Sequence, residues 1–215
     1  MKTRIVWAFA AVMLLAAPVQ ADSSDTFARG EAAAANGNHA KAVGIWEPLA
    51  AEGHASAQRA LAGMYAAGLG VDPDIDKAVA LFRKAAKQGD AEAALGLASM
   101  YERGLGVDAD AARARHWYRQ AAEAGFARAQ TVLAAIYRHG RGTEADPARA
   151  VKWYTKAAEN GHAPAQLQLA RLYRDGELVT RDADRALEWY KAAAENGHAL
   201  ARKERRALQA QEDGS

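Results

Sequence analysis

The most constraining feature of this chain is a sequence repeat with a period of 36 residues. A glycine marks the period at five places along the chain: Gly53, Gly89, Gly125, Gly161 and Gly197. Leucine, tyrosine, aspartate and paired alanines recur at the same spacing in other columns of the repeat. A fixed period of this length is typical of arrays in which one supersecondary unit is copied and stacked. The repeat therefore favours a solenoid over an ordinary helical bundle.

Each 36-residue unit contains the pattern of two helices. In the first unit Ala57, Leu61 and Tyr65 share one face of a helix, and Gly68 follows as a residue suited to the left-handed conformation that ends it. Asp74 then stands before a second apolar face, in the position of a helix N-cap. Because one such hairpin cannot bury its apolar face alone, we expect an all-α fold, a right-handed α-solenoid of antiparallel helix hairpins.

The repeat also divides the chain into segments. We expect a signal peptide at 1–21, a flexible leader at 22–26, a divergent N-terminal helical hairpin at 27–52, four repeats at 53–88, 89–124, 125–160 and 161–196, and a C-terminal capping helix and tail at 197–215. Pro48 should kink or split the second helix of the N-terminal hairpin. Leu178 replaces a recurrent loop glycine, so the loop of the fourth repeat should be shaped differently.

The first 21 residues have the pattern of an export signal. Lys2 and Arg4 precede an apolar stretch at 5–17, and Val19 and Ala21 occupy the −3 and −1 positions of a cleavage site after Ala21. The stretch is shorter than the roughly 20 residues of a membrane span. We therefore expect a periplasmic or secreted protein with no membrane span after signal removal; an uncleaved membrane anchor is the alternative.

The charge balance argues against nucleic acid as a partner. The chain has 28 basic and 26 acidic residues, and loss of Lys2 and Arg4 with the signal leaves 26 of each. Nucleic-acid-binding domains usually carry a strong basic patch, which a neutral chain does not suggest. There is no cysteine, so stability must come from packing without disulfides.

A search for catalytic and metal-binding motifs predicts no catalytic, cofactor or metal site. The serines lie in neither G-x-S-x-G nor S-x-x-K, and there is no cysteine nucleophile. His54, His162 and His198 share one column of the repeat, which would place them too far apart for one zinc ion and near helix starts instead. The recurrent Trp-Tyr pairs are interpreted as core.

The remaining candidate surface is the face of the first helices that turns away from the core, which we expect to line a concave groove. The residue types at the positions of this face differ from unit to unit, whereas the framework positions keep the same residue types. This is expected if each unit contributes different contacts to one extended partner. The candidate partner-binding residues are Arg59, Glu102, Arg103, Arg138, His139, Arg171 and Arg174. The last arginines make the face locally basic, which favours an acidic protein segment as partner; an ordinary solvated face is the alternative.

The segment Leu97–Asp110, together with Trp117–Gly125, resembles the Sel-one-like repeat, a relative of the tetratricopeptide repeat. The resemblance implies a binding or adaptor protein that regulates a membrane sensor, assists envelope or polysaccharide assembly, or contacts host proteins, with an envelope or membrane protein segment as partner. It also raises a β-lactamase-like or cell-wall-related enzyme as an alternative, although the relatives linked to β-lactams are cysteine-rich. A self-associating structural solenoid is a third possibility.

Overall fold

The structure is a computed structural model that describes residues 23–214, so the expected signal peptide lies outside the described residues. Within this range the chain forms eleven α-helices and no strand. The helices are α1 (Ser23–Ala35), α2 (His39–Ala51), α3 (Ala55–Ala67), α4 (Ile75–Lys87), α5 (Ala91–Arg103), α6 (Ala111–Glu123), α7 (Ala127–His139), α8 (Pro147–Glu159), α9 (Ala163–Asp175), α10 (Ala183–Glu195) and α11 (Ala199–Asp213).

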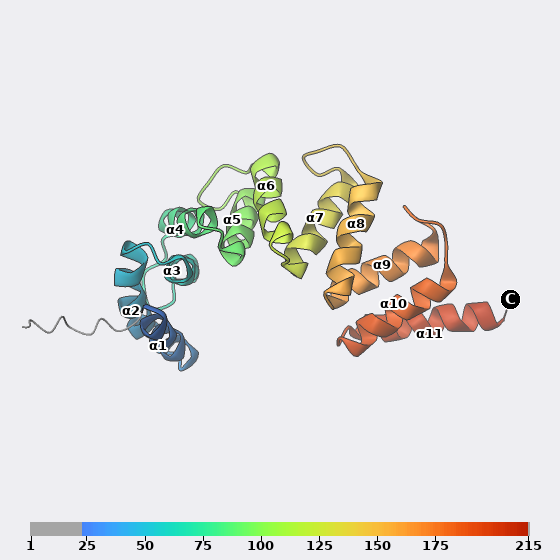
Figure 1. Cartoon of the computed structure of the whole chain (residues 1–215), viewed down its shortest axis with the longest axis horizontal. Helices are drawn as coiled ribbons and strands as arrows, with labels where there is room; N and C mark the ends of the chain where they lie inside the picture. The colour runs from blue at the N-terminus through green and yellow to red at the C-terminus, as the bar shows by residue number, and fades with distance from the viewer. Residues whose placement is uncertain (1–22, 215) are drawn as a thin grey trace, which may run out of the picture.

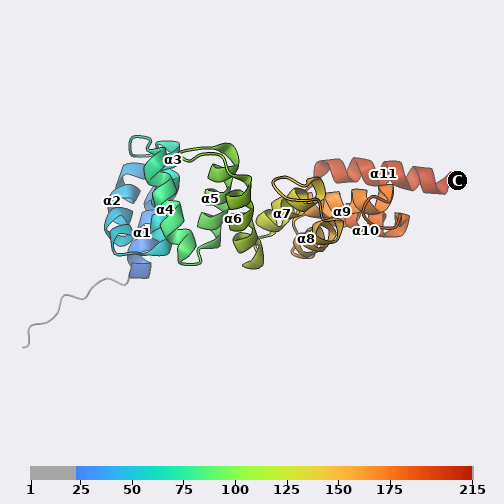
Figure 2. The same ribbon diagram turned by 90° about the horizontal axis from the view of Figure 1, so that it is seen from above.

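The helices pack as successive antiparallel hairpins, and each helix contacts the next one along the chain. Figure 1 shows these hairpins following one another along a curved arch, with α3 and α5 on its inner side and α4 and α6 outside them. Seen from above, the arch is narrow and elongated (Figure 2). The expected all-α repeat solenoid is confirmed.

The helix ends follow the repeat. The N-cap aspartates of the second helices each accept a hydrogen bond from the backbone N–H three residues later, at 2.8–3.0 Å: Asp74, Asp110, Asp146 and Asp182. Each first helix of the four repeats ends at a left-handed glycine, such as Gly68 with φ 65°. These local signals explain why each unit makes two helices of 13 residues.

A basic residue in the first turn of each second helix adds a link between the two helices of a unit. Arg113 pairs with its own N-cap, Asp110, at 3.2 Å, and its guanidinium lies 5.6 Å from the ring centre of Tyr101 in the preceding helix. The same arrangement recurs one and two repeats later, in Arg149 over Tyr137 and Arg185 over Tyr173. The repeat thus preserves an ion pair and a cation–π contact as well as apolar positions.

The core is a continuous layer of alanine and leucine with tyrosine between the helices. Leu97, Leu133 and Leu169 are almost fully buried, and the small residues Ala62, Ala98, Ala134 and Ala170 are completely buried at equivalent positions. Alanine at these positions allows the helix backbones to approach closely. The tyrosine of each Trp-Tyr pair is buried, whereas the tryptophans are half-buried.

Buried glutamines join consecutive units. Gln130 donates a hydrogen bond from Nε2 to the Ala122 carbonyl at 3.1 Å and accepts one from Asn160 Nδ2 at 3.1 Å. Equivalent bonds are made by Gln58 and Gln166. In the second repeat the column holds alanine, and the Ala86 carbonyl instead accepts a bond from Gln120 at 2.7 Å. The carbonyl at each junction, which also accepts a backbone N–H, therefore receives a side-chain hydrogen bond by one route or the other.

Three local expectations are corrected by the structure. The flexible leader expected at 22–26 is helical from Ser23 onward, as the first turn of α1. Pro48 lies inside α2 without splitting it, since the helix continues to Ala51; the expected kink stays a prediction. Leu178 adopts φ 63°, close to the 63–73° of Gly70, Gly106 and Gly142, so the fourth loop keeps the common turn despite the strain of a left-handed leucine.

Candidate functional site

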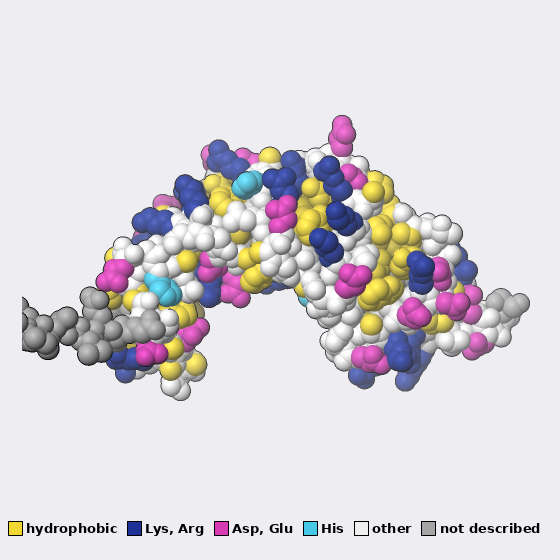
Figure 3. Space-filling model, in the orientation of Figure 1, with side chains coloured by type: hydrophobic (Ala, Val, Ile, Leu, Met, Phe, Trp, Pro, Cys, Tyr) yellow, Lys and Arg dark blue, Asp and Glu magenta, His cyan; other side chains and the backbone are white. Residues whose placement is uncertain are grey.

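A hollow lies between the first helices α3, α5 and α7. It has a volume of about 710 Å³, within the range of pockets that bind ligands. Apolar side chains form much of its wall, with Phe82 and Leu95 half-buried and Met100 buried. The hollow inner side of the arch is visible in the space-filling view (Figure 3). We call this hollow the α3–α5–α7 groove.

The groove lies beside two columns of the repeat in which the first repeat carries small residues and the fourth repeat carries arginine. Gly63 and Ser99 line the groove in the column that holds Arg171 in the fourth repeat. Ala66 occupies the column of Arg138 and Arg174. A Cβ added at Gly63 would meet no atom within 4 Å, so the space directly beside it is open. Small side chains in these columns therefore leave the surface between α3 and α5 hollow.

Three arginines border the groove, and they differ in how their charge is balanced. Arg59 is ion-paired with Asp90 at 3.1 Å and with Glu92 at 2.6 Å. Arg103 and Arg128 are exposed and make no ion pair or hydrogen bond with any other described side chain. The rim of the groove therefore carries two positive charges whose carboxylate partners are not supplied by residues 23–214.

The inner wall also holds a buried tyrosine. The Tyr118 hydroxyl donates a 2.7 Å hydrogen bond to Glu102, which also lies 3.6 Å from Arg141. Burial raises the pKa of Tyr118 well above its ordinary value, and the bond to the Glu102 carboxylate adds to this effect. The positive charges of Arg128 and Arg141 lower the pKa of Tyr118, but by less than burial raises it. Tyr118 is thus a neutral hydrogen-bonding group at the groove and not a source of negative charge.

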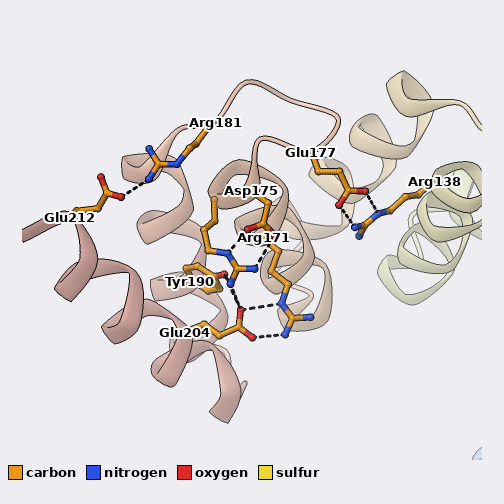
Figure 4. Close-up of polar contacts among 9 residues, drawn as sticks. Arg138, Arg171, Asp175, Glu177, Arg181, Tyr190, Glu204 and Glu212 are labelled. Atoms are coloured by element: carbon orange, nitrogen blue, oxygen red, sulfur yellow. Dashed lines mark hydrogen bonds and ion pairs between the residues drawn. The ribbon is translucent and has the colours of Figure 1, made fainter. Parts of the chain in front are cut away.

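The same face is filled by ion pairs in the C-terminal half (Figure 4). Arg138 makes a bidentate contact with Glu177, at 3.0 Å from Nε and 2.5 Å from Nη2. Its Nη1 also donates to Gln168 at 3.4 Å. Glu177 belongs to the loop after α9, so the loop of the fourth repeat neutralises an arginine of the third.

Glu204 of α11 joins two further arginines to the C-terminal helix. It accepts hydrogen bonds from Arg171, from Arg174 at 3.1 Å and from the Tyr190 hydroxyl at 2.9 Å. Arg174 also pairs with Asp175 at 2.6 Å. Hydrogen bonds from Arg171 lower the pKa of Glu204 from 4.5 to about 2, with Tyr190 and Arg174 contributing further. These arginines hold α11 in place and have less capacity for an outside carboxylate.

The predicted partner-binding residues therefore separate into two groups. Arg59 and Arg103 line the α3–α5–α7 groove, while Arg138, Arg171 and Arg174 lie in the ion-paired half. Glu102 supports Tyr118, and His139 is exposed at the end of α7. The basic stretch from Arg138 to Arg174 is thus balanced within the chain. The partner-binding role of all seven residues stays a prediction.

Two groove residues were missed by the sequence analysis. Arg128 stands in a column that holds Glu92 in one neighbouring repeat and Pro164 in the other, and nothing in that column suggested a binding role. Phe82, in the column of the tyrosine of the Trp-Tyr pairs, is half-buried and opens onto the groove. The signal that could have found them was the loss of large side chains at Gly63, Ala66 and Gly96 in adjacent units.

The described residues contain no group of three or more His, Cys, Asp or Glu side chains that could hold a metal ion. His54 is an N-cap whose Nδ1 accepts the Ala57 N–H at 3.3 Å, and His162 and His198 begin helices at the equivalent positions. Burial lowers the pKa of His162, with a smaller contribution from Arg128. The column of histidines thus starts helices, as its spacing indicated. Among residues 23–214 no helix has the length and apolar character needed to cross a membrane.

Comparisons with known proteins place these features in context. A family model described as the Sel1 repeat matches four consecutive segments, 55–90, 91–126, 127–162 and 163–198. The crystal structure of a Sel1 repeat protein from Oxalobacter formigenes shares 33% identity and a TM-score of 0.80, covering 85% of this chain and 76% of that chain. No curated protein sequence matches the chain.

Two further solved structures show the same architecture. A protective antigen of uropathogenic Escherichia coli strains, which displays an SLR fold, is 32% identical with a TM-score of 0.78. The match covers 88% of this chain but only 42% of the antigen, so this chain spans less than half of its length. A putative Sel1 repeat protein from Klebsiella pneumoniae, at 21% identity and a TM-score of 0.54, covers 87% of this chain and 93% of that chain and shows the fold alone.

Proposed function

Because this chain belongs to the Sel1 repeat family, we propose that it is a non-catalytic scaffold or adaptor that binds a protein segment along the inner side of its solenoid. Sel1 repeat proteins are typically protein-interaction scaffolds. The observation that carries the proposal is the α3–α5–α7 groove, a hollow with a mixed apolar and polar wall and two arginines that have no carboxylate partner among residues 23–214. Extended concave surfaces of stacked repeats suit this use.

We further propose that the protein acts in the bacterial periplasm, with an envelope or membrane protein segment as its partner. The support for this location is the pattern of residues 1–21, with its basic start, short apolar stretch and cleavage site. The absence of cysteine is compatible with an oxidising compartment, since no thiol can mispair there. Expression of the full chain followed by cell fractionation and N-terminal sequencing tests it; a cytoplasmic protein that retains Met1 would contradict it.

The groove has little that would support covalent catalysis. Its wall contains two hydroxyl groups, those of Ser99 and Tyr118, and no histidine lies among its lining residues to activate either of them. A nitrocefin hydrolysis assay on the purified protein tests the enzymatic alternative. We expect turnover no faster than in buffer; hydrolysis that persists through repeated purification would overturn the non-catalytic proposal.

The binding function is tested by crosslinking in living cells followed by affinity purification of the chain. We expect one or a few proteins to be recovered in amounts comparable to the chain itself. Light scattering over a range of concentrations separates this outcome from self-association. If the only recovered protein is the chain itself, and the particle size measured by light scattering increases with concentration, the solenoid is a self-assembling structure and not an adaptor.

A further inference from the structure

We infer that the α3–α5–α7 groove is an anchoring site for an acidic peptide segment that inserts one large apolar side chain and places carboxylates on Arg103 and Arg128. This inference rests on the proposed function and adds the chemistry of the partner. It assigns binding to the first two repeats and the start of the third, in place of the basic stretch around Arg138, Arg171 and Arg174.

Large apolar side chains line the wall of the groove. Phe82, Leu95 and Val132 line the groove and are only half-buried, so each leaves apolar surface open to solvent there. They surround open space beside Gly63, where a Cβ would meet nothing within 4 Å. Burying such surface is favourable, at about 25 cal/mol for each Å² of apolar area removed from water. An aromatic or long aliphatic side chain of a partner matches this hollow in size and polarity.

The depth of the groove depends on glycine at a second point. A side chain at Gly96 would approach Phe82 to 2.9 Å, so glycine allows the Phe82 ring to lie against the α5 backbone. The equivalent column holds Val132, Gln168 and Glu204 in the following units. In the last of these units the space is taken by Glu204 with its arginine partners. The later repeats thus fill from within the chain a space that the earlier repeats leave open.

The rim of the groove carries arginines that differ in how their charge is balanced. Arg59 already has Asp90 and Glu92, so it offers no free positive charge. Arg103 and Arg128 have no carboxylate partner among the described residues, in contrast to Arg138, Arg171 and Arg174. Guanidinium groups favour bidentate contact with carboxylates. A segment with acidic residues flanking its apolar anchor therefore complements the groove, and a basic segment would be repelled.

The protein offers a matched pair of glycines for the test. Gly63 in α3 and Gly44 in α2 both lie inside helices, and at both an added Cβ would meet no atom within 4 Å. Replacing either with methionine removes a residue that weakens helices, so neither variant should lose its fold. Gly63→Met fills the groove, whereas Gly44→Met leaves it unchanged because α2 does not line it.

The probe is a random peptide library displayed on phage and selected against the purified protein. We expect recovered peptides to share one Phe, Leu, Ile or Met flanked by Asp or Glu. Synthetic peptides of that sequence should bind the Gly44→Met variant as they bind the unaltered protein. They should bind Gly63→Met and the double variant Arg103→Glu/Arg128→Glu at least tenfold more weakly, with circular dichroism confirming that all variants remain helical.

Two results would overturn the inference. One is recovery of basic or uncharged peptides, or of no peptide family enriched above the unselected library. The other is equal binding to the Gly63→Met and Gly44→Met variants. If a partner is nevertheless captured in cells by the Gly63→Met variant, the adaptor function stands and only the assignment to this groove fails.

Discussion

We expect Glu204 to stabilise the attachment of α11 to the preceding helices. This carboxylate is 16% exposed and is bonded to Arg171, Arg174 and Tyr190, which together join α11 to α9 and α10. Lowering its pKa from 4.5 to about 2 corresponds to roughly 3 kcal/mol, because each tenfold change in proton affinity is worth about 1.4 kcal/mol. Arg171 and Arg174 are about one-third exposed, and solvent screening there reduces the expected contribution to about 2 kcal/mol.

The perturbation is Glu204→Gln, which keeps the shape of the side chain and removes its charge. We expect the α11 amides to lose about 2 kcal/mol of protection at pH 7, or roughly a thirtyfold change in their hydrogen-exchange rates. The matched control is Glu212→Gln, which loses a more exposed ion pair to Arg181 and should cost less than about 1 kcal/mol.

The pH dependence of the same effect has a definite sign. The folded-state pKa of Glu204 is depressed, so its contribution is complete above about pH 5 and is lost as the pH falls towards 2. The difference between the unaltered protein and Glu204→Gln should therefore shrink across that window. Equal α11 protection in the two proteins at pH 7, or a difference that does not change down to pH 2.5, would refute the reasoning.

Three further variants test the framework by urea unfolding followed through circular dichroism. Gln130→Ala removes a side-chain hydrogen bond to the Ala122 carbonyl, which still accepts the Gly125 N–H, and removes the bond from Asn160. It should cost about 1 kcal/mol, and no change would contradict the junction role of the glutamines. Gly70→Ala places a Cβ 2.4 Å from the backbone of residues 39–40, at a residue with φ 73°, and should lower the free energy of unfolding by more than about 2 kcal/mol. Gly89→Ala is the control, because its Cβ meets no atom within 4 Å, and it should cost about 1 kcal/mol. Gly30→Ala would place a Cβ 2.2–2.7 Å from atoms of the Trp46 ring and should destabilise the protein by about 2 kcal/mol. Gly44→Ala is the control, because its Cβ meets no atom within 4 Å, and it should stabilise the protein by up to about 1 kcal/mol. A stabilising Gly30→Ala would show that α1 is not packed on Trp46.

The helices could be predicted from the sequence because their signals are local and repeated. The aspartate N-caps, the glycines that end the first helices and Pro147 at a helix start all lie where short-range rules place them. The fold class follows from the period itself. Leu178 shows the limit of these rules, since it adopts the left-handed conformation that the backbone preference of leucine opposes.

The candidate site was predicted only in part. The sequence identified the face of the first helices but took clustered arginines as available charge. Arg138 and Arg171 meet carboxylates 39 and 33 residues further along the chain, beyond the reach of any local pattern. The groove, in turn, is defined by missing side chains at Gly63 and Ala66, and a hollow becomes evident only once the neighbouring helices are placed.

The most direct test of the central claim is site-specific photo-crosslinking in living cells. A photoreactive amino acid at Ser99 lies in the α3–α5–α7 groove, whereas the same group at the exposed Glu123 lies at the end of α6 and outside the groove. We expect a discrete crosslinked protein from position 99 and none from position 123. Identical crosslinks from both positions, or none from position 99 while the chain still recovers its partner, would contradict the claim that the groove binds that partner.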